Sequence, residues 1–298
     1  QGRIVPIARV QVVQPEFDGT ITAINVRNGT SVRAGEVLIE FDDTEVLAER
    51  DIIEAELDRL TIESARLKTL LSGLTLEMVE ASGLRTKLLD AFTASFSGPQ
   101  QYYLEQKALL GAEIDDLLAS LDQIAARQVA NVRSEEITRA NIDRVEAALT
   151  IQAERLEVSQ DLLDRGTTSR SAFLDAQDAF TQLESEREIY LRELDQKISQ
   201  QAALAAERSS NIAALRNRSL QRLTEIEARK ADLYQQLTTA QRRLDGVKLS
   251  APVTGVVDKL EVYTVGGVAS AGEELLRVVP MDDTFEIEAV FSNTDIGF

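Results

Sequence analysis

The chain of 298 residues contains no histidine and no cysteine. These absences exclude imidazole and thiolate metal sites, cysteine nucleophiles and disulfide bonds. Tryptophan is also absent and aromatic residues make up only 5% of the chain, so a thick globular core is not expected. Acidic neighbours such as Asp115 and Asp116 are typical of a solvated helix face rather than of carboxylates paired for acid–base catalysis. We therefore expect no catalytic residue, no metal and no cofactor.

Basic residues are outnumbered, with 32 Lys and Arg against 50 Asp and Glu and a formal net charge of −18. This charge argues against nucleic acid or an anionic bilayer surface as the main partner. The sequence also lacks any run of about 18 apolar residues, which a membrane-spanning helix requires. Because it starts without Met and ends abruptly at Phe298, we expect a fragment whose membrane anchor lies outside it.

Proline is scarce in the middle of the chain, where Pro99 is the only one between Thr44 and Asp245. Apolar residues recur there at alternating steps of three and four, which is the signature of coiled coils. The clearest series is Leu223, Ile226, Leu233, Leu237, Ala240, Leu244 and Val247. A second is Val46, Ile53, Leu57, Leu60, Leu67, Leu71, Leu74 and Met78, and a third is Ile114, Leu117, Leu121 and Ile124. The pattern predicts a long coiled coil.

The apolar stripe becomes polar between Gln128 and Thr138. Its positions there carry Gln128, Asn131, Glu135 and Thr138. This zone indicates either a flexible waist or a shift of the stripe to Val129, Val132 and Ile137. We favour the shift.

Two similar β-like segments flank the coiled coil. From Gly19 to Ile39 and from Gly255 to Val278, alternating apolar residues are separated by glycine-containing turns. Aligned on Gly19 and Gly255, the matching pairs are Ile21 with Val257, Ile24 with Leu260, Val26 with Val262 and Val32 with Val268. Two Ala-Gly-Glu-x-Leu turns then match after one inserted residue. Each half is too short to bury its own apolar face, so the halves should pack on each other and the helical block must double back as a hairpin.

The glycines of these two half-motifs are expected to be turn residues, because none lies between a strand and a helix as in a phosphate-binding loop. They are Gly19, Gly29, Gly35, Gly255, Gly266, Gly267 and Gly272.

The strongest turn inside the helical block spans 165–169. Gly166 suits a left-handed helix end, and Thr168 or Ser169 can cap the next helix. The leg before this turn is about 40 residues longer than the leg after it, which a helix cannot absorb by stretching. We predict a rising helix over 43–71, a fold-back over 74–94, a second rise over 99–165, the tip at 165–169 and a descent over 169–246. The rival is one continuous helix to Ala94 followed by a looser return.

The two ends of the chain read as strands of a further β domain. Residues 3–13 form one or two strands interrupted at Pro6, and residues 284–291 alternate cleanly and could pair with them. The predicted domains are therefore 1–13 as the first strand or strands of a barrel-like domain, 14–42 and 247–281 as the halves of the split domain, 43–246 as the hairpin, and 282–298 as the truncated remainder of the barrel-like domain.

Two β half-motifs split by a coiled-coil hairpin resemble the biotinyl/lipoyl-like domains of bacterial membrane-fusion proteins, also called periplasmic adaptors. The chain is most similar to the haemolysin-D type (HlyD family) of type I secretion systems. The phrases that carry the resemblance are Val13-Gln14-Pro15-Glu16, Phe41-Asp42-Asp43-Thr44, Ala251-Pro252-Val253-Thr254-Gly255-Val256-Val257, Tyr263-Thr264-Val265-Gly266-Gly267-Val268 and Val278-Val279-Pro280-Met281-Asp282-Asp283. The resemblance implies a mainly α fold with β structure: a long antiparallel coiled-coil hairpin inserted into a split lipoyl-like β-sandwich, plus part of a second, barrel-like β domain.

The resemblance also implies a function. Such adaptors are non-catalytic and join an inner-membrane ABC transporter to an outer-membrane tunnel protein of the TolC type, with the secreted polypeptide in transit. It implies a homo-oligomer, typically a hexameric ring, in the periplasm of a Gram-negative bacterium, anchored to the inner membrane by an N-terminal helix that this sequence does not contain.

The same resemblance points to the hairpin tip as the docking site for the tunnel. Related adaptors carry an Arg, a Leu and a Ser around the tip; Leu162 and Ser169 match, but the Arg position is Val158, with Arg155 or Arg165 as possible substitutes. The candidate docking residues are Leu162, Arg165, Gly166, Ser169 and Phe173. Judged from the residues themselves, Leu162 and Phe173 are typical of the last layer of a helical seam, Ser169 of a helix cap, and Arg165 of a solvated side chain.

Three other functions compete with this one. A carrier domain with biotin or lipoate on a hairpin lysine does not fit, because residues 38–44 and 276–283 contain no Lys. An adaptor for a drug or small-peptide efflux pump and a structural coiled-coil tether remain as alternatives.

Overall fold

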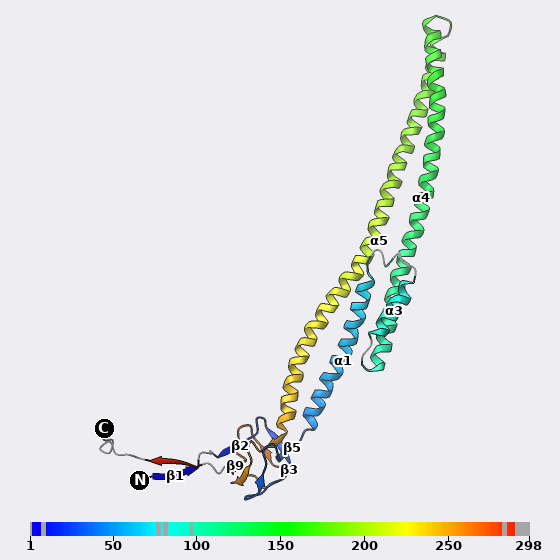
Figure 1. The fold of residues 1–298 in the computed structure, drawn as a ribbon. Coiled ribbons are helices and arrows are strands. Elements are labelled where there is room, and N and C mark those ends of the chain that lie inside the picture. The colour runs from blue at the N-terminus through cyan, green and yellow to red at the C-terminus, as the bar shows by residue number, and fades with distance from the viewer. Residues whose placement is uncertain are drawn as a thin grey trace, which may run out of the picture. The chain divides into compact units, whose positions relative to one another are not determined.

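The computed structural model describes residues 2–6, 10–75, 79, 83–95, 98–281 and 285–289, the first and last of these ranges without their side chains. Its helices are α1 (Thr44–Gly73), α3 (Leu84–Ala94), α4 (Gln100–Asp164) and α5 (Arg170–Gly246), drawn in Figure 1. The strands are β1 (Gly2–Pro6), β2 (Gln11–Val13), β3 (Gly19–Ile24), β4 (Ser31–Val32), β5 (Val37–Phe41), β6 (Lys248–Ser250), β7 (Gly255–Asp258), β8 (Val268–Ala269), β9 (Leu276–Pro280) and β10 (Phe285–Ala289). The chain divides into two compact units, residues 1–61 with 226–298 and residues 62–225.

The first unit contains two four-stranded antiparallel sheets, ordered β2-β9-β7-β4 and β6-β5-β3-β8. The two half-motifs exchange their short strands: Val32 of β4 lies opposite Gly255 of β7, and Ala269 of β8 lies opposite Gly19 of β3. Backbone hydrogen bonds repeat the exchange, because the Gly29 N–H donates to the Val257 carbonyl and the Gly266 N–H donates to the Ile21 carbonyl, both at 2.8 Å. Neither half can therefore complete its sheet without the other.

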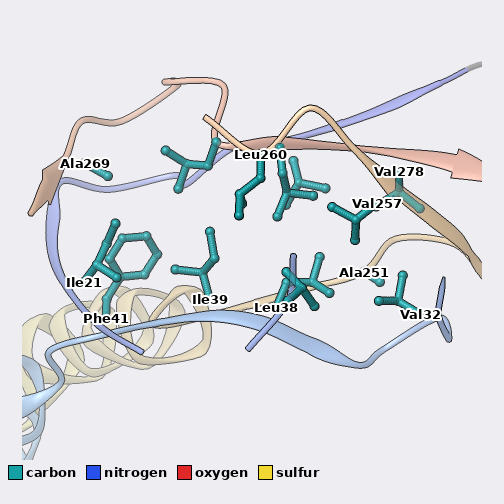
Figure 2. Close-up of a cluster of buried hydrophobic side chains, with 14 of the residues drawn as sticks. Ile21, Val32, Leu38, Ile39, Phe41, Ala251, Val257, Leu260, Ala269 and Val278 are labelled. Atoms are coloured by element: carbon teal, nitrogen blue, oxygen red, sulfur yellow. The ribbon is translucent and has the colours of Figure 1, made fainter. Parts of the chain in front are cut away.

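The core between these sheets draws on both half-motifs, as Figure 2 shows. Ile21, Leu38 and Phe41 come from the first half, and Val257 and Val278 come from the second; none of the five is more than 6% exposed. Fully burying an aliphatic or Phe side chain of this kind contributes about 1.5–3 kcal/mol. The prediction that the two halves pack on each other is confirmed.

Two details of the sequence interpretation are wrong. The partner of Val32 in the repeat is Ala269 rather than Val268: Val32 and Ala269 are each 1% exposed and Val268 is 74% exposed. The inserted residue thus precedes β8 instead of following it. The boundary after residue 13 is also misplaced, since β2 pairs with β9 and Val13 is in the sandwich core. The expected pairing of the two ends is confirmed for β1 and β10; residues 282–284 and 290–298 lie outside the described residues.

In the second unit the chain folds back once beside α4. Gly73, at the end of α1, lies against Leu88 of α3, and Ile62 of α1 lies against Gly98, beyond the end of α3. These contacts make α3 antiparallel to α1, and α3 packs on α4 through the stacked rings of Phe92 and Tyr103, 5.5 Å apart. Because α1 ends at Gly73, a continuous helix to Ala94 is excluded. Of the predicted fold-back over 74–94, residues 76–78 and 80–82 lie outside the described residues.

Beyond this region α4 and α5 form an antiparallel hairpin. Between Gln128 and Thr138 the buried positions of the seam continue at steps of three and four without a shift. Asn131 is 6% and Thr138 is 3% exposed. The alternative stripe of Val129, Val132 and Ile137 is 40–64% exposed, so the favoured shift is wrong. The seam accepts the polar residues because their hydrogen bonds are made: the Asn131 amide donates to the Lys197 carbonyl, and the Thr138 hydroxyl donates within α4. The helix α4 passes through the zone without a break.

Candidate functional site: the hairpin tip

The end of α4 is closed by a double backbone hydrogen bond. The Thr167 N–H donates to the Leu162 carbonyl at 3.0 Å and the Gly166 N–H donates to the Leu163 carbonyl at 2.9 Å, the pattern of a Schellman helix end. Gly166 has φ +68°, which an L side chain adopts only with strain, while a Cβ added there would meet nothing within 4 Å. The glycine is therefore required by backbone conformation and not by crowding.

The start of α5 is capped by Ser169, whose hydroxyl oxygen accepts a hydrogen bond from the Ala172 N–H at 3.2 Å. The Thr167 hydroxyl donates to the Leu162 carbonyl at 2.9 Å and so ties the turn to the preceding helix. The tip is consequently a short turn with most of its shape determined by its own hydrogen bonds.

Charge at the tip is concentrated on the last turn of α4. Arg165 Nη2 lies 2.6 Å from Asp161 Oδ2, and the two side chains are 68% and 53% exposed. An exposed pair of this kind contributes little to stability, about 0.2–1 kcal/mol. Its components remain accessible to a partner.

The two apolar candidates occupy different environments. Phe173 is half-buried, which is consistent with its expected place in the last layer of the helical seam. Leu162 is 39% exposed, whereas the adjacent Leu163 is half-buried and takes the seam position. The expectation that Leu162 belongs to the last layer of the seam is therefore wrong. Leu162, Arg165, Gly166 and Ser169 thus share an exposed surface, from which Phe173 is set apart. Sequence reasoning did not identify the neighbouring Val158, 60% exposed, as part of this apolar surface.

The seven half-motif glycines fall into two groups. Four lie in turns with positive φ: Gly29 (86°), Gly35 (83°), Gly266 (89°) and Gly272 (78°).

The other three lack a positive φ. Gly19 and Gly255 are the first residues of β3 and β7, so the expectation that they are turn residues is wrong. A Cβ at Gly19 would lie 3.0 Å from the Phe41 ring, and one at Gly255 would lie 2.2 Å from the Val279 carbonyl oxygen. Gly267 closes a turn by donating its N–H to the Thr264 carbonyl. These three glycines therefore have structural roles in the sandwich.

The sequence matches a known protein family. Residues 9–280 match the family described as RND MFP, barrel-sandwich hybrid domain, which covers most of the chain. The chain belongs to this family of membrane fusion proteins. This match confirms the predicted resemblance to membrane-fusion proteins.

Individual relatives point to type I secretion. The chain is 26% identical over 301 residues to the chromosomal hemolysin secretion protein D of Escherichia coli, covering 100% of this chain and 61% of that protein. It is 26% identical to the type I secretion system membrane fusion protein PrsE of Rhizobium meliloti (strain 1021), covering 99% and 66%. It is 28% identical to the alkaline protease secretion protein AprE of Pseudomonas aeruginosa, covering 93% and 62%. The chain spans roughly three fifths of the length of the first of these relatives.

Solved structures confirm the predicted fold class. The soluble domain of LipC, a membrane fusion protein of a type I secretion system, aligns with a TM-score of 0.77 at 21% identity, covering 91% of this chain and 100% of that one. The periplasmic adaptor protein EmrA aligns with a TM-score of 0.54 at 18% identity, covering 98% and 79%. Among the residues that the structure describes, no helix is both long and apolar enough to cross a membrane.

Proposed function

We propose that the chain is the periplasmic part of a non-catalytic adaptor for one-step type I protein secretion. It bridges an inner-membrane ABC transporter and an outer-membrane tunnel channel, and the tip of the α4–α5 hairpin docks on the channel. The secreted polypeptide passes through the assembly. The adaptor is a homo-oligomer, a hexamer in keeping with the family resemblance, and an N-terminal helix of the full-length protein anchors it to the inner membrane of a Gram-negative bacterium.

The observation that carries the docking assignment is the tip itself. The turn at 165–169, whose shape is determined by its own hydrogen bonds, joins two long helices at their far end. Arg165 and Ser169 of this turn, and Leu162 in the last turn of α4, are exposed to solvent. Exposed residues on a turn held by rigid helices have little structural reason to combine an apolar and a cationic side chain. The names of the relatives supply the process, since PrsE and AprE are both described as secretion proteins.

The test is a secretion assay with tip variants of the full-length protein. Each variant replaces the adaptor in a strain deleted for it, and the cognate substrate is measured in the medium and in the cells. We expect Arg165→Glu and Leu162→Asp each to reduce the secreted fraction strongly while the protein level and helix content stay unchanged. Arg165→Glu reverses the charge of one tip side chain, and Leu162→Asp replaces an apolar tip side chain with a charged one.

A control variant makes the same Arg-to-Glu substitution at a position on α4 away from the tip. Arg139 is 57% exposed and forms an i,i+4 ion pair with Glu135, which is 20% exposed, at 2.7 Å on α4 away from the tip. Arg139→Glu should leave secretion unchanged. Normal secretion from both tip variants would overturn the docking assignment, and a deletion strain that secretes normally would overturn the adaptor function.

A drug or small-peptide efflux adaptor is the second candidate, because the adaptor EmrA shares the fold. The same deletion strain separates the two functions. Loss of protein secretion with unchanged susceptibility to antimicrobial compounds supports the secretion role, and the reverse result supports efflux.

A further inference from the structure

Asn28 and Gly29 form the only Asn-Gly pair in the sequence, and they lie in the turn between β3 and β4. Asparagine is among the thermally labile residues of proteins. It is most reactive before glycine, because glycine has no side chain to obstruct its own backbone nitrogen. The other asparagines are followed by bulkier residues, as in Asn131-Val132. Asn28 is therefore the position at which the sequence most favours spontaneous loss of a side-chain amide.

The reaction at such a pair requires no catalyst. The Gly29 nitrogen attacks the side-chain carbon Cγ of Asn28, so that a new N–Cγ bond forms, the Cγ–Nδ2 bond breaks, and ammonia leaves with the proton of the Gly29 amide. Water then opens the five-membered imide at one of its two C–N bonds. Opening at Cγ gives aspartate, and opening at the backbone carbonyl carbon gives isoaspartate, in which the main chain runs through the side chain. No oxidant or reductant takes part.

The folded sandwich engages both reacting groups in other hydrogen bonds. The Gly29 N–H donates to the Val257 carbonyl at 2.8 Å. The Asn28 Oδ1 accepts a hydrogen bond from the Leu260 N–H at 2.6 Å. The first bond must break before the Gly29 nitrogen can attack, and the second must break before the Asn28 side chain can turn toward it. Both bonds come from the second half-motif, more than 200 residues away in the sequence.

Burial does not protect the pair, because Asn28 and Gly29 are both exposed and water reaches them. Their partners are core residues: Val257 is 1% and Leu260 is 4% exposed. The Val257 N–H also donates to the Thr30 carbonyl at 2.9 Å, which fixes the residue after the pair on β7. The turn can leave these partners only when the sandwich opens locally. The protection therefore depends on the association of the two half-motifs.

We propose that Asn28-Gly29 is a site of spontaneous deamidation and isomerisation that the second half-motif suppresses. A chain with a closed sandwich keeps its asparagine. A chain whose halves have separated accumulates aspartate and isoaspartate at position 28. The rate of the reaction then reports how often the sandwich opens, because opening releases both reacting groups.

The two products differ in their effect on the fold. Aspartate at position 28 keeps the oxygen that accepts the Leu260 N–H, so it is compatible with the closed sandwich. Isoaspartate adds one carbon atom to the main chain immediately before Gly29. This extra atom displaces Thr30 and the pairing of Val32 with Gly255, where β4 joins β7. We therefore expect only isoaspartate to prevent the two halves from joining.

Peptide mass spectrometry of the purified full chain measures the reaction, because conversion of the amide to a carboxyl changes the mass of the peptide that contains residue 28. A synthetic peptide of residues 24–33 in the same buffer is the unprotected reference. We expect the folded chain to react at least about tenfold more slowly than the peptide, which corresponds to an opening free energy of at least about 1.4 kcal/mol. Equal rates in the folded chain and the peptide would overturn the proposal.

The unfolded chain supplies the second half of this comparison. In guanidinium chloride the reaction at Asn28 should accelerate to the rate of the peptide measured in the same solution. A rate that stays as slow as in the folded chain would show that the half-motifs do not provide the protection.

The equivalent turn of the second half-motif provides a matched control. Gly266 has φ +89° against +86° at Gly29, and its N–H donates to the Ile21 carbonyl at the same distance of 2.8 Å. Val265 precedes Gly266 and is 59% exposed. Val265→Asn therefore creates a second Asn-Gly pair that keeps the backbone hydrogen bond and carries its side chain in solvent.

Both pairs are followed in the same folded molecule. We expect residue 265 of the Val265→Asn variant to lose its amide severalfold faster than Asn28, because the Leu260 N–H holds the Asn28 side chain. In guanidinium chloride the two positions should react at similar rates. Equally slow reaction at both positions of the folded chain would contradict the role of the Leu260 hydrogen bond. A difference that persists in guanidinium chloride would assign the rates to the neighbouring residues instead of the fold.

Refolding tests the effect of isoaspartate. After incubation in guanidinium chloride the chain is returned to native buffer, and the folded and aggregated fractions are separated. Enzymatic methylation of isoaspartyl groups should show that the folded fraction is depleted of isoaspartate. The variant Asn28→Asp should refold as the parent does. Equal isoaspartate content in both fractions would contradict the expected displacement of β4.

Discussion

The side-chain amide of Asn131 donates a hydrogen bond to the backbone carbonyl of Lys197, 2.9 Å away across the α4–α5 seam. The same amide lies 3.2 Å from Gln201 Oε1. A buried Asn at a core position of a coiled coil determines register at some loss of stability, because only one alignment satisfies its hydrogen bonds. Asn131 therefore holds the two legs of the hairpin in the alignment that places the tip at 165–169.

Two substitutions of Asn131 should have different effects on the unfolding free energy and on the alignment of α4 with α5. Asn131→Ala leaves the seam with a cavity and unmade hydrogen bonds, and we expect a loss of about 1–3 kcal/mol in the unfolding free energy. Asn131→Leu should be nearly neutral or stabilising, but the hairpin should then populate shifted alignments. Urea unfolding followed by circular dichroism measures the first effect.

A crosslink across the seam measures the second effect. Cysteines at Gln152 and Ala176, which are joined by a hydrogen bond of 3.0 Å, should crosslink less efficiently when Asn131→Leu is present. Undiminished crosslinking would show that Asn131 does not determine the register.

The polar seam also shows where sequence reasoning failed. Counting apolar residues favoured Val129, Val132 and Ile137 over Asn131 and Thr138, since the count cannot register hydrogen bonds made across the seam. In the β-sandwich, a one-residue error in the repeat assigned Val268 to the buried side. Adjacent strand residues point to opposite faces, so such an error exchanges buried and exposed positions.

Other parts of the fold were accessible from the sequence because local chemistry determines them. Gly166 followed by Ser169 predicted the tip, and the Schellman end and the serine cap are both present. The repeated half-motif predicted a shared core but not the exchange of β4 and β8 between the halves, which depends on contacts distant in sequence. For Leu162 the periodic pattern favoured the seam, but Leu162 is 39% exposed and the adjacent Leu163 is half-buried instead.

Gly255 should be intolerant of any side chain. A Cβ there would lie 2.2 Å from the Val279 carbonyl oxygen and 2.8 Å from its carbon, both backbone atoms of the neighbouring strand β9. Gly255→Ala must separate β7 from β9, and we expect a loss of about 3 kcal/mol or more, or no folded sandwich at all.

Gly111→Ala is the control for Gly255→Ala. Gly111 lies inside α4, where the nearest neighbour of an added Cβ is a flexible Arg85 side chain at 3.4 Å. This substitution should stabilise by about 0.5–1 kcal/mol, because alanine favours the helix. Thermal unfolding of both variants should give shifts of opposite sign; two shifts of the same sign would refute the packing argument.

The start of α1 should be sensitive to acid. The Thr44 hydroxyl and the Thr44 N–H donate hydrogen bonds to Asp42 Oδ1 at 2.6 and 3.0 Å, and they lower the pKa of the Asp42 carboxyl from its ordinary 3.8. Since the folded pKa lies below the unfolded one, the stabilisation is complete above the unfolded value and is lost as the pH falls through the folded value.

Asp42→Asn is the variant that isolates this carboxylate. Hydrogen exchange at the first turn of α1 should be faster in Asp42→Asn than in the parent above about pH 5, and the difference should shrink as the pH falls below 3.8. A difference that is independent of pH across this range would show that the charge of Asp42 is not involved.

Substitutions at Gly166 distinguish the shape of the tip from its chemistry. A Cβ added at Gly166 would meet no neighbouring atom, but the φ of +68° is strained for an L side chain. Gly166→Ala should therefore destabilise the tip by about 1 kcal/mol. Asn tolerates this conformation better than other residues, which makes Gly166→Asn the matched variant. Under the proposed docking, secretion should fall in Gly166→Ala and recover largely in Gly166→Asn, because Arg165 and Ser169 then regain their positions. Equal secretion from Gly166→Ala and the parent, at equal protein level, would mean that the channel does not depend on the geometry of this turn.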